Sequence, residues 1–488
     1  MSDDKPPEPD TSPAKPPEKP SDDLVTTRHT LRTPSGELAY TATAGRTVLR
    51  HEKHTDGVFD GHEPHAEIFT VAYTLDDADP ATRPVTFAFN GGPGSSSVWL
   101  HLGLLGPRRV AMGDAGVLTG PPWGLVDNAE SLLAHSDLVF VDPVSTGYSR
   151  ATAGGRPADF HGYAPDVESI GELIRLWTSR HGRWGSPKYL AGESYGTLRA
   201  VALAEHLQDR HGMFPNGLML ISSVLDMGTI RFHEGNDLPY PLFVPTYAAI
   251  AHHHGRHGDR PLADVLAEAE GFATGDYAWA LARGSRLAQG DRDRVAATLA
   301  RLTGLSEAYV RRARLRIEHL RFFRELLRDE GRTVGRIDGR FTGWEPDDTG
   351  ESVGHDPSIA AVMGPYTAAI NAYLRGELGY SCDLPYEGLS DRVHPWSYKD
   401  FEGRAVSVVG KLSAAMRTNP HLRVHVASGY HDGATPWLAT EHTLAALPVP
   451  DELRANIEVS YFEAGHMMYV HEPSRVRQSA ELAAFVTP

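Results

Sequence analysis

The order of apolar segments along the chain predicts an α/β protein, in which a mostly parallel central sheet carries helices on both faces. Short apolar runs of strand length, such as 85–89 and 188–191, alternate with segments of helical apolar spacing, such as 165–180. Parallel neighbours need crossover connections, which are usually helices. The alternation stops after about residue 228 and resumes after about residue 396, which indicates a large insertion between two parts of one core.

Each element of this core has a signal of its own. Residues 37–74 contain stretches in which polar and apolar residues alternate, so we expect an opening pair of antiparallel strands. Further strands are expected at 85–89, 137–142, 188–191, 218–221, 423–427 and 457–462, and helices at 165–180, 197–207 and 408–417.

The same pattern divides the chain into four segments. Residues 1–25 are rich in Pro, Asp, Glu, Lys and Ser, which predicts a disordered acidic tail. Residues 26–228 and 397–488 are expected to form the two parts of the core. Residues 229–396 are rich in Arg, Glu, Ala and Leu at helical spacing, so we expect an inserted helical cap above the edge where the strands end.

The charge and cysteine content exclude several classes of protein. The 488 residues carry a formal net charge of −16, whereas nucleic acids and anionic membranes are bound by clustered Lys and Arg. No apolar run approaches membrane-spanning length, and the N-terminus lacks the apolar segment of a secretory signal. Cys382 is the only cysteine, so no disulfide can form within the chain. We therefore expect a cytoplasmic protein, with export by another route left open.

The sequence Gly192-Glu193-Ser194-Tyr195-Gly196 lies between a strand-like and a helix-like segment. A serine flanked by glycines at a sharp strand-to-helix turn is a nucleophile elbow, in which only small neighbours leave room for the exposed side chain. Chance alone produces such a five-residue pattern in many chains of this composition. The prediction that Ser194 is a nucleophile therefore depends on the rest of a catalytic apparatus.

Two later segments supply candidates for that apparatus. A serine hydroxyl needs a histidine that takes its proton and a carboxylate that orients the histidine. In hydrolases with such an elbow the acid comes first and the histidine last, each after a strand. Asp432 follows the strand at 423–427 and His466 follows the strand at 457–462. Asp432 could also be a plain turn residue, and His466 is one of 25 histidines. The prediction therefore depends on the serine, the acid and the histidine occurring together in the expected order.

A catalytic serine also needs backbone N–H groups that stabilise the oxyanion. One is expected from Tyr195, the residue after the nucleophile, and another from a glycine-rich loop after an early strand. Residues 90–97, Asn-Gly-Gly-Pro-Gly-Ser-Ser-Ser, follow the strand at 85–89 directly. A phosphate-binding loop would carry a Lys after the glycines or the spaced glycines of a dinucleotide unit, and neither is present.

Other conspicuous segments favour simpler interpretations. His51, His54, His62 and His65 match no helical zinc motif, so a solvated loop is expected, and His252–His254 are expected at the surface. Ser306 is expected to begin a cap helix that runs to residue 327. Its basic stretch, 311–324, is interleaved with Leu and Phe and is expected to be a solvated helix face rather than a nucleic-acid site.

Five blocks of the sequence resemble the serine carboxypeptidase family, in that family's order. They are Asn-Gly-Gly-Pro-Gly-Ser-Ser-Ser at 90–97, Val-Asp-Pro-Val-Ser-Thr-Gly-Tyr-Ser at 141–149, Gly-Glu-Ser-Tyr-Gly at 192–196, Ser-Gly-Tyr-His-Asp at 428–432 and Gly-His-Met at 465–467. The resemblance implies an α/β-hydrolase fold with an inserted helical cap and the release of C-terminal amino acids from peptides. It implies a triad of Ser194, Asp432 and His466, oxyanion donors at Gly92 and Tyr195, and substrate contacts from Asn90, Gly91, Glu193 and Met467.

Glu193 has a physical logic of its own. A carboxyl group beside the nucleophile can donate a hydrogen bond to a substrate carboxylate only while it is protonated, and when ionised it repels that carboxylate. The chain departs from the family nearby. Leu104 stands where a second carboxylate-binding acid is usual, Ala88 where a tryptophan is usual, and Ser95 where a cysteine is usual. Recognition of a free C-terminus is therefore the open part of the prediction.

The sequence therefore predicts a serine-type peptidase that removes C-terminal residues through an acyl-enzyme, with His466 as general base and then acid. This chemistry needs no metal or cofactor, and a peptide with a free C-terminus is the expected partner. The alternatives are an esterase or amidase, an acyltransferase or lyase on the same scaffold, and a non-catalytic binding protein that keeps the pocket. An intact set of three catalytic groups argues against the last.

Overall fold

The computed structural model describes residues 20–347 and 349–487. The expected disordered tail falls mostly on residues 1–19, outside the described residues. Its last part differs from the expectation, because strand β1 begins at Asp23 and pairs with the next strand. The Asp23 carboxylate lies 3.1 Å from the guanidinium of Arg46 on that neighbour, so an acidic residue is accommodated in the strand.

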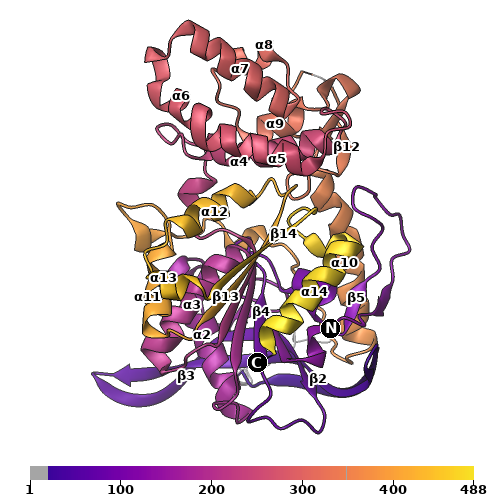
Figure 1. Cartoon of the computed structure of the whole chain (residues 1–488). Coiled ribbons are helices and arrows are strands. Elements are labelled where there is room, and N and C mark those ends of the chain that lie inside the picture. Colours follow the sequence, from indigo (N-terminus) through magenta and orange to yellow (C-terminus); the bar gives the residue numbers. More distant parts are fainter. Residues whose placement is uncertain (1–19, 348, 488) are drawn as a thin grey trace, which may run out of the picture.

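One sheet of ten strands organises the molecule (Figure 1). Its first strands are antiparallel, and from β7 to β14 each neighbouring pair runs parallel. This confirms the predicted α/β class, and the strand order is that of an α/β-hydrolase fold. The order is β1 (Asp23–Thr33), β2 (Gly36–Thr55), β3 (Val58–Leu75), β7 (Asp137–Val141), β4 (Val85–Phe89), β9 (Lys188–Ser194), β10 (Gly217–Ser223), β13 (Arg423–Gly429) and β14 (Ile457–Phe462), with β8 (Arg150–Ala151) beside β3.

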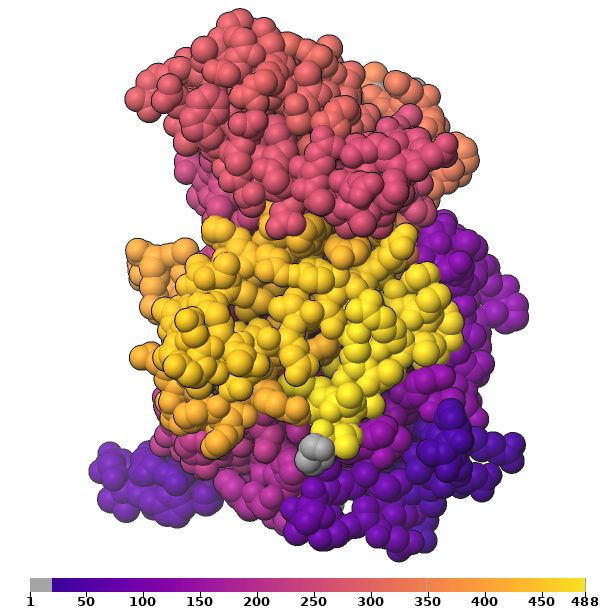
Figure 2. Space-filling model, viewed as in Figure 1, coloured from indigo at the N-terminus to yellow at the C-terminus, as the bar shows by residue number. Residues whose placement is uncertain are grey.

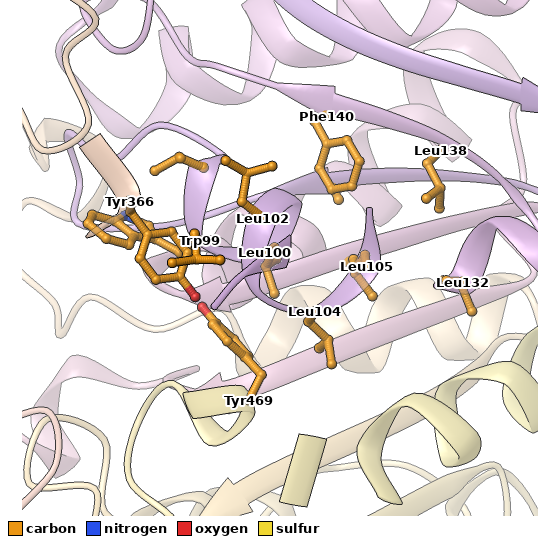
Figure 3. Packing of buried hydrophobic residues seen from close by; sticks show 14 of the residues in the cluster. Trp99, Leu100, Leu102, Leu104, Leu105, Leu132, Leu138, Phe140, Tyr366 and Tyr469 are labelled. Atoms are coloured by element: carbon orange, nitrogen blue, oxygen red, sulfur yellow. The ribbon is translucent and has the colours of Figure 1, made fainter. Parts of the chain in front are cut away.

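Helices cover both faces of the sheet, which explains why the parallel strands are apolar on every side. On β4, Phe87 packs into one apolar cluster and Ala88 into the other, as the two-residue period of a strand requires. The cluster around Phe87 includes side chains of α2 (Tyr163–Arg180), α3 (Tyr195–His211) and α11 (Val409–Thr418). The cluster around Ala88 includes α1 (Val98–Leu100), the π-helical turn η1 (His101–Leu105), α10 (Pro357–Gly376) and α14 (Glu472–Val486), as Figure 3 shows in part.

Between β10 and β13 the chain builds a lobe above the sheet, which we call the cap lobe (residues 239–344; Figures 1 and 2). Its helices share a third apolar cluster, which also takes in Trp437 and Leu438 of α12 (Trp437–Ala445). By contrast, α10 comes from the same stretch of sequence but packs on the sheet. The cap lobe contains α4 (Pro239–His253), α5 (Leu262–Phe272), α6 (Ala278–Arg283), α7 (Gln289–Thr303), α8 (Glu307–Arg312), α9 (His319–Glu325), β11 (Arg332–Val334) and β12 (Thr342–Trp344).

Two expectations for local structure were wrong. Ser306 does cap a helix, accepting the Tyr309 N–H, but the helix breaks after α8 because Arg314 and Leu315 adopt left-handed φ angles of 53° and 66°. Of the basic residues expected on a solvated face, Arg324 is buried. Among the described residues, no helix is long and apolar enough to cross a membrane.

The stretch from His51 to His65 is not a loop. It forms the outer part of a long hairpin of β2 and β3, which turns at Asp56-Gly57. Both turn residues have positive φ, 49° and 78°, and an Asp-Gly pair is well suited to such a two-residue turn. The hairpin therefore continues past the sheet, with His51 and His54 on β2 and His62 and His65 on β3.

Candidate active site

Ser194 lies where β9 ends and α3 begins, as the elbow pattern predicts. Its backbone has φ 60° and ψ −129°, a conformation that costs a non-glycine residue energy and that surrounding structure must hold in place. The flanking glycines permit the turn. A Cβ added to Gly192 would lie 2.1 Å from the Gly196 carbonyl oxygen, and one on Gly196 would lie 2.8 Å from the Phe89 carbonyl oxygen.

Asp432 and His466 come together on loops after β13 and β14. Nδ1 of His466 lies 2.7 Å from Oδ2 of Asp432, and both side chains are buried. The other carboxylate oxygen of Asp432 accepts the N–H groups of Ala434 at 2.8 Å and Thr435 at 2.9 Å. The Thr435 hydroxyl donates to Oδ2 at 2.7 Å. These donors orient the carboxylate toward the imidazole.

The electrostatics of His466 suit a general base. Burial by itself lowers the pKa of His466, but the charge of Asp432 and its hydrogen bond outweigh burial and leave that pKa above its usual value. Ser194 and His466 line the same cavity. No hydrogen bond joins the two side chains in the described part of the chain, which is common in hydrolases without substrate.

The glycine-rich loop after β4 lies directly against the elbow. A Cβ on Gly91 would come within 2.4 Å of the Tyr195 nitrogen, so only glycine allows this approach. Gly92 has a φ of 99°, which also favours glycine. Gly92, Ser194 and Tyr195 line one cavity together, as the expected oxyanion donors and nucleophile should. The loop is held from behind by Asp142, whose carboxylate accepts both the N–H and the hydroxyl of Ser97.

Asn90 and Glu193 form a hydrogen-bonded pair beside the nucleophile. The Asn90 Nδ2 amide donates to Oε1 of Glu193 at 2.8 Å. The Asn90 side-chain oxygen accepts the Leu100 N–H at 3.1 Å, which fixes the orientation of the amide. From α3, the buried guanidinium of Arg199 donates to the Asn90 carbonyl oxygen at 2.5 Å and pairs with Asp166 at 2.8 Å.

Glu193 is fully enclosed by protein, and this burial raises the pKa of its carboxyl group to about 7. The charge of the nearby His466, the Tyr469 hydroxyl and the Asn90 amide act in the opposite direction but do not cancel the effect of burial on this pKa. Oε2 of Glu193 is buried and has no hydrogen-bond partner among the described residues. The carboxyl group is therefore protonated under mildly acidic conditions, and the Tyr469 hydroxyl lies beside it.

Two tyrosines occupy the region behind Glu193. The hydroxyl groups of Tyr366 on α10 and Tyr469 in η10 (Met468–Val470) point toward one another (Figure 3). Both side chains pack closely against Gly103. A Cβ added to Gly103 would lie 2.3 Å from the Tyr469 ring and 2.6 Å from the Tyr366 hydroxyl oxygen. Leu104, at the place of the missing acid, is buried in the apolar cluster. Nothing in the sequence pointed to the tyrosines, because their meeting depends on how α10 and η10 pack.

Two cavities open on either side of Ser194. The larger, of about 630 Å³, extends beneath the cap lobe along Val224, Met227 and Phe232. The smaller, of about 300 Å³, contains the pair of Asn90 and Glu193. Its walls include Trp99, Ile359, Val362 and Met467, the last of which is one of the residues expected to contact substrate.

The cap lobe touches both loops that carry Asp432 and His466. We call the link between β11 and β12, residues 335–341, the bridging segment. The Ile337 carbonyl oxygen accepts the His466 N–H at 2.6 Å, and the Gly339 N–H donates to the His431 carbonyl oxygen at 3.1 Å. Arg340 pairs with Asp338 at 2.7 Å and donates to the Glu463 carbonyl oxygen at 2.9 Å. A Cβ on Gly465 would clash with Asp338 at 2.4 Å.

Metal binding has no support in the described residues, in which no cluster of three or more His, Cys, Asp or Glu side chains could hold a metal ion. His254 at the end of α4 instead contacts the Gly339 carbonyl oxygen at 2.8 Å. The sequence predicted His254 at the surface, but the residue is half-buried because the bridging segment packs against it.

Residues 49–223, which carry the glycine-rich loop and the elbow, match the family model described as serine carboxypeptidase. Two curated relatives from Arabidopsis thaliana are similar over part of the chain. Serine carboxypeptidase-like 11 is 28% identical over 163 residues, and serine carboxypeptidase-like 33 is 29% identical over 139 residues. This part of the chain is therefore similar to the serine carboxypeptidase family.

The similarity to these family members is partial. The matched regions cover 33% and 28% of this chain and only 36% and 27% of the relatives' own lengths. Solved structures with a similar arrangement include a proline iminopeptidase from Mycobacterium smegmatis, 14% identical, with 90% of this chain and 97% of that chain covered and a TM-score of 0.36. Another is Est816, an N-acyl homoserine lactone degrading enzyme, 12% identical, with 89% and 100% covered and a TM-score of 0.35.

Proposed function

We propose that this protein is a serine peptidase that releases the C-terminal residue of peptides through an acyl-enzyme intermediate. The observation that carries the proposal is the pair of Asn90 and Glu193 in the cavity that also contains Ser194 and His466. A buried carboxyl group with a shifted pKa beside a nucleophile is a candidate functional group, and in its protonated form it can donate to a substrate carboxylate.

In the proposed reaction, Ser194 Oγ attacks the last peptide carbonyl while His466 takes the hydroxyl proton. Asp432 holds the imidazole at 2.7 Å and stabilises its positive charge. The N–H groups of Gly92 and Tyr195 receive the developing oxyanion, an interaction whose loss typically costs about 10²- to 10³-fold in rate. His466 then protonates the leaving amine. Water, activated by the same histidine, hydrolyses the acyl-enzyme and frees Ser194.

The leaving residue occupies the smaller cavity in this scheme. Its carboxylate accepts a hydrogen bond from protonated Glu193, which Asn90 holds in position. The remaining peptide extends into the larger cavity beneath the cap lobe. The cavity sizes support this assignment, since about 300 Å³ suits one amino acid and about 630 Å³ a longer segment.

Labelling by a fluorophosphonate, with Ser194→Ala as control, tests the serine hydrolase chemistry. Turnover of an N-blocked dipeptide is then compared with that of its C-terminal amide. We expect labelling of the wild type alone and at least about tenfold higher kcat/KM for the free acid, the value of one good hydrogen bond. Absence of labelling would contradict the hydrolase, and equal turnover of acid and amide would contradict the carboxypeptidase.

An esterase or amidase is the second candidate, and Leu104 is the observation that favours it. The absence of the second acid leaves one carboxyl group, Glu193, for the substrate carboxylate. In that case the comparison above gives equal rates for acid and amide, and a simple ester of the same acyl group is cleaved at least as fast as the dipeptide.

A further inference from the structure

The side chain of Arg336 stands apart from the other arginines near the site. It is exposed, and its guanidinium makes no ion pair or hydrogen bond with any described residue. Arg340, four residues on, is paired with Asp338, and Arg199 is paired with Asp166. A guanidinium with five unused donors beside a reactive serine is a ready partner for a carboxylate of the substrate.

Arg336 lines both cavities, as Ser194 does. The acidic groups in these cavities, Glu193, Glu318 and Asp391, form no ion pair with it. No other arginine or lysine lines the smaller cavity. Among the described residues, Arg336 is therefore the one permanent positive charge in the cavity that also holds Asn90 and Glu193.

The backbone around Arg336 is fixed relative to the catalytic histidine. The Arg336 N–H donates to the Asp356 carboxylate at 3.2 Å. The next residue, Ile337, accepts the His466 N–H at 2.6 Å. The Arg336 backbone is thus held in place next to the catalytic histidine, so ligand binding has to order only its side chain.

A substrate carboxylate in the smaller cavity needs a partner beyond Glu193. A neutral carboxyl group can donate one hydrogen bond but cannot balance a negative charge that has been taken out of water. The second acid of the family's usual arrangement is replaced by Leu104. An arginine provides both charge and a fork of donors that matches the two carboxylate oxygens.

We propose that Arg336 binds the C-terminal carboxylate of the peptide, opposite the pair of Asn90 and Glu193. The inference rests on the proposed peptidase function and assigns its selectivity to a residue of the cap lobe. Because a guanidinium stays charged at all physiological pH values, Arg336 also keeps free-acid peptides bound above the pH at which Glu193 ionises.

The test compares Arg336→Gln with wild type on an N-blocked dipeptide and its C-terminal amide. The acid-to-amide ratio of kcat/KM should fall about 10- to 100-fold in the variant, the range for one lost charge-assisted hydrogen bond. Arg336→Lys should recover part of the ratio, since it keeps the charge but not the fork. Arg312→Gln, an exposed arginine of α8 outside both cavities, should keep the wild-type ratio.

The possible results separate this inference from the proposed function. Wild type that cleaves acid and amide equally overturns the peptidase and this inference together. Wild type that prefers the acid, with a preference that Arg336→Gln retains, overturns the role of Arg336 alone. A parallel loss for acid and amide also overturns it, because Arg336 then serves the acyl part of the substrate. Thermal denaturation verifies that each variant is folded. We expect the Arg336 variants to fold, because the wild-type side chain has no partner among the described residues that a substitution would remove.

Discussion

The Asn90 Nδ2 amide donates a hydrogen bond to Oε1 of Glu193 over 2.8 Å, and Oε2 of the same carboxyl group has no partner in the described residues. One oxygen is thus held in place, while the other is buried beside the Tyr469 hydroxyl. Since burial raises the pKa of Glu193 to about 7, the protonation of this group changes within the pH range in which most peptidases operate.

KM for free-acid peptides should rise as pH increases through about 7. Below that pH Glu193 is protonated and donates to the substrate carboxylate, and above it the ionised group repels the carboxylate. Glu193→Gln keeps a donor that does not titrate, so its KM should change little with pH. Steady-state kinetics between pH 5 and 9 measure both profiles. A flat wild-type profile would contradict this role of Glu193.

Asp432→Asn should lower kcat by about 10⁴-fold with little change in KM, because the amide no longer stabilises the protonated His466. The four donor contacts around the carboxylate make it the orienting group of the site. Thr435→Val removes one of them and should cost far less. Single-turnover kinetics measure the rate loss in each variant. Thr435→Val would lose more than Asp432→Asn if Thr435 rather than Asp432 oriented the imidazole.

Gly103→Ala should weaken binding of free-acid peptides and lower Tm. Its new Cβ would lie 2.3 Å from the Tyr469 ring, so the tyrosine must move away from Glu193, typically at a cost of about 1–3 kcal/mol. Gly376→Ala is the matched control, because nothing lies within 4 Å of the added Cβ at the end of α10. Equal Tm and KM for the two variants would show that the tyrosine pair tolerates displacement.

Asp338→Ala should destabilise the protein by about 3–5 kcal/mol, since it leaves the buried Arg340 guanidinium without its carboxylate. Activity should fall with stability, because Arg340 also contacts the backbone that leads to His466. Glu37→Ala breaks an exposed pair with Arg32 and should alter Tm little. Denaturant unfolding with parallel kcat measurements checks both statements. A stable but inactive Asp338→Ala would indicate that the pair acts on the chemistry alone.

The sheet was predictable from sequence because its strands are short, apolar and sharply bounded. The runs 85–89 and 457–462 coincide with β4 and β14. The cap helix from Ser306 was predicted too long, because its helical spacing continues through Arg314 and Leu315, whose backbone is turned by packing. Local pattern carries no information on such tertiary effects.

The candidate site also contains residues that the sequence predicts and residues that it does not. Ser194, Asp432 and His466 each follow a strand, so their chain order alone suggested that they meet, and the geometry brings Asp432 and His466 into contact. Arg336 and Tyr469 could not be predicted in this way. Arg336 lies at the site because of the packing of the cap lobe, and Tyr469 because of the packing of η10. The residues to which we assign substrate selectivity thus come from the parts of the chain with the weakest sequence signals.

The bridging segment has a consequence for the modularity of the enzyme. Ile337 and Gly339 hydrogen-bond to the backbone of the loops that carry His466 and Asp432, so the inserted lobe is a structural part of the candidate site rather than a detachable cover. Deleting the lobe, or exchanging it for that of a relative, would leave the His466 N–H without its acceptor. Transplanting substrate preference between family members therefore requires moving residues 335–341 together with the loops at 429–435 and 463–467 as one unit.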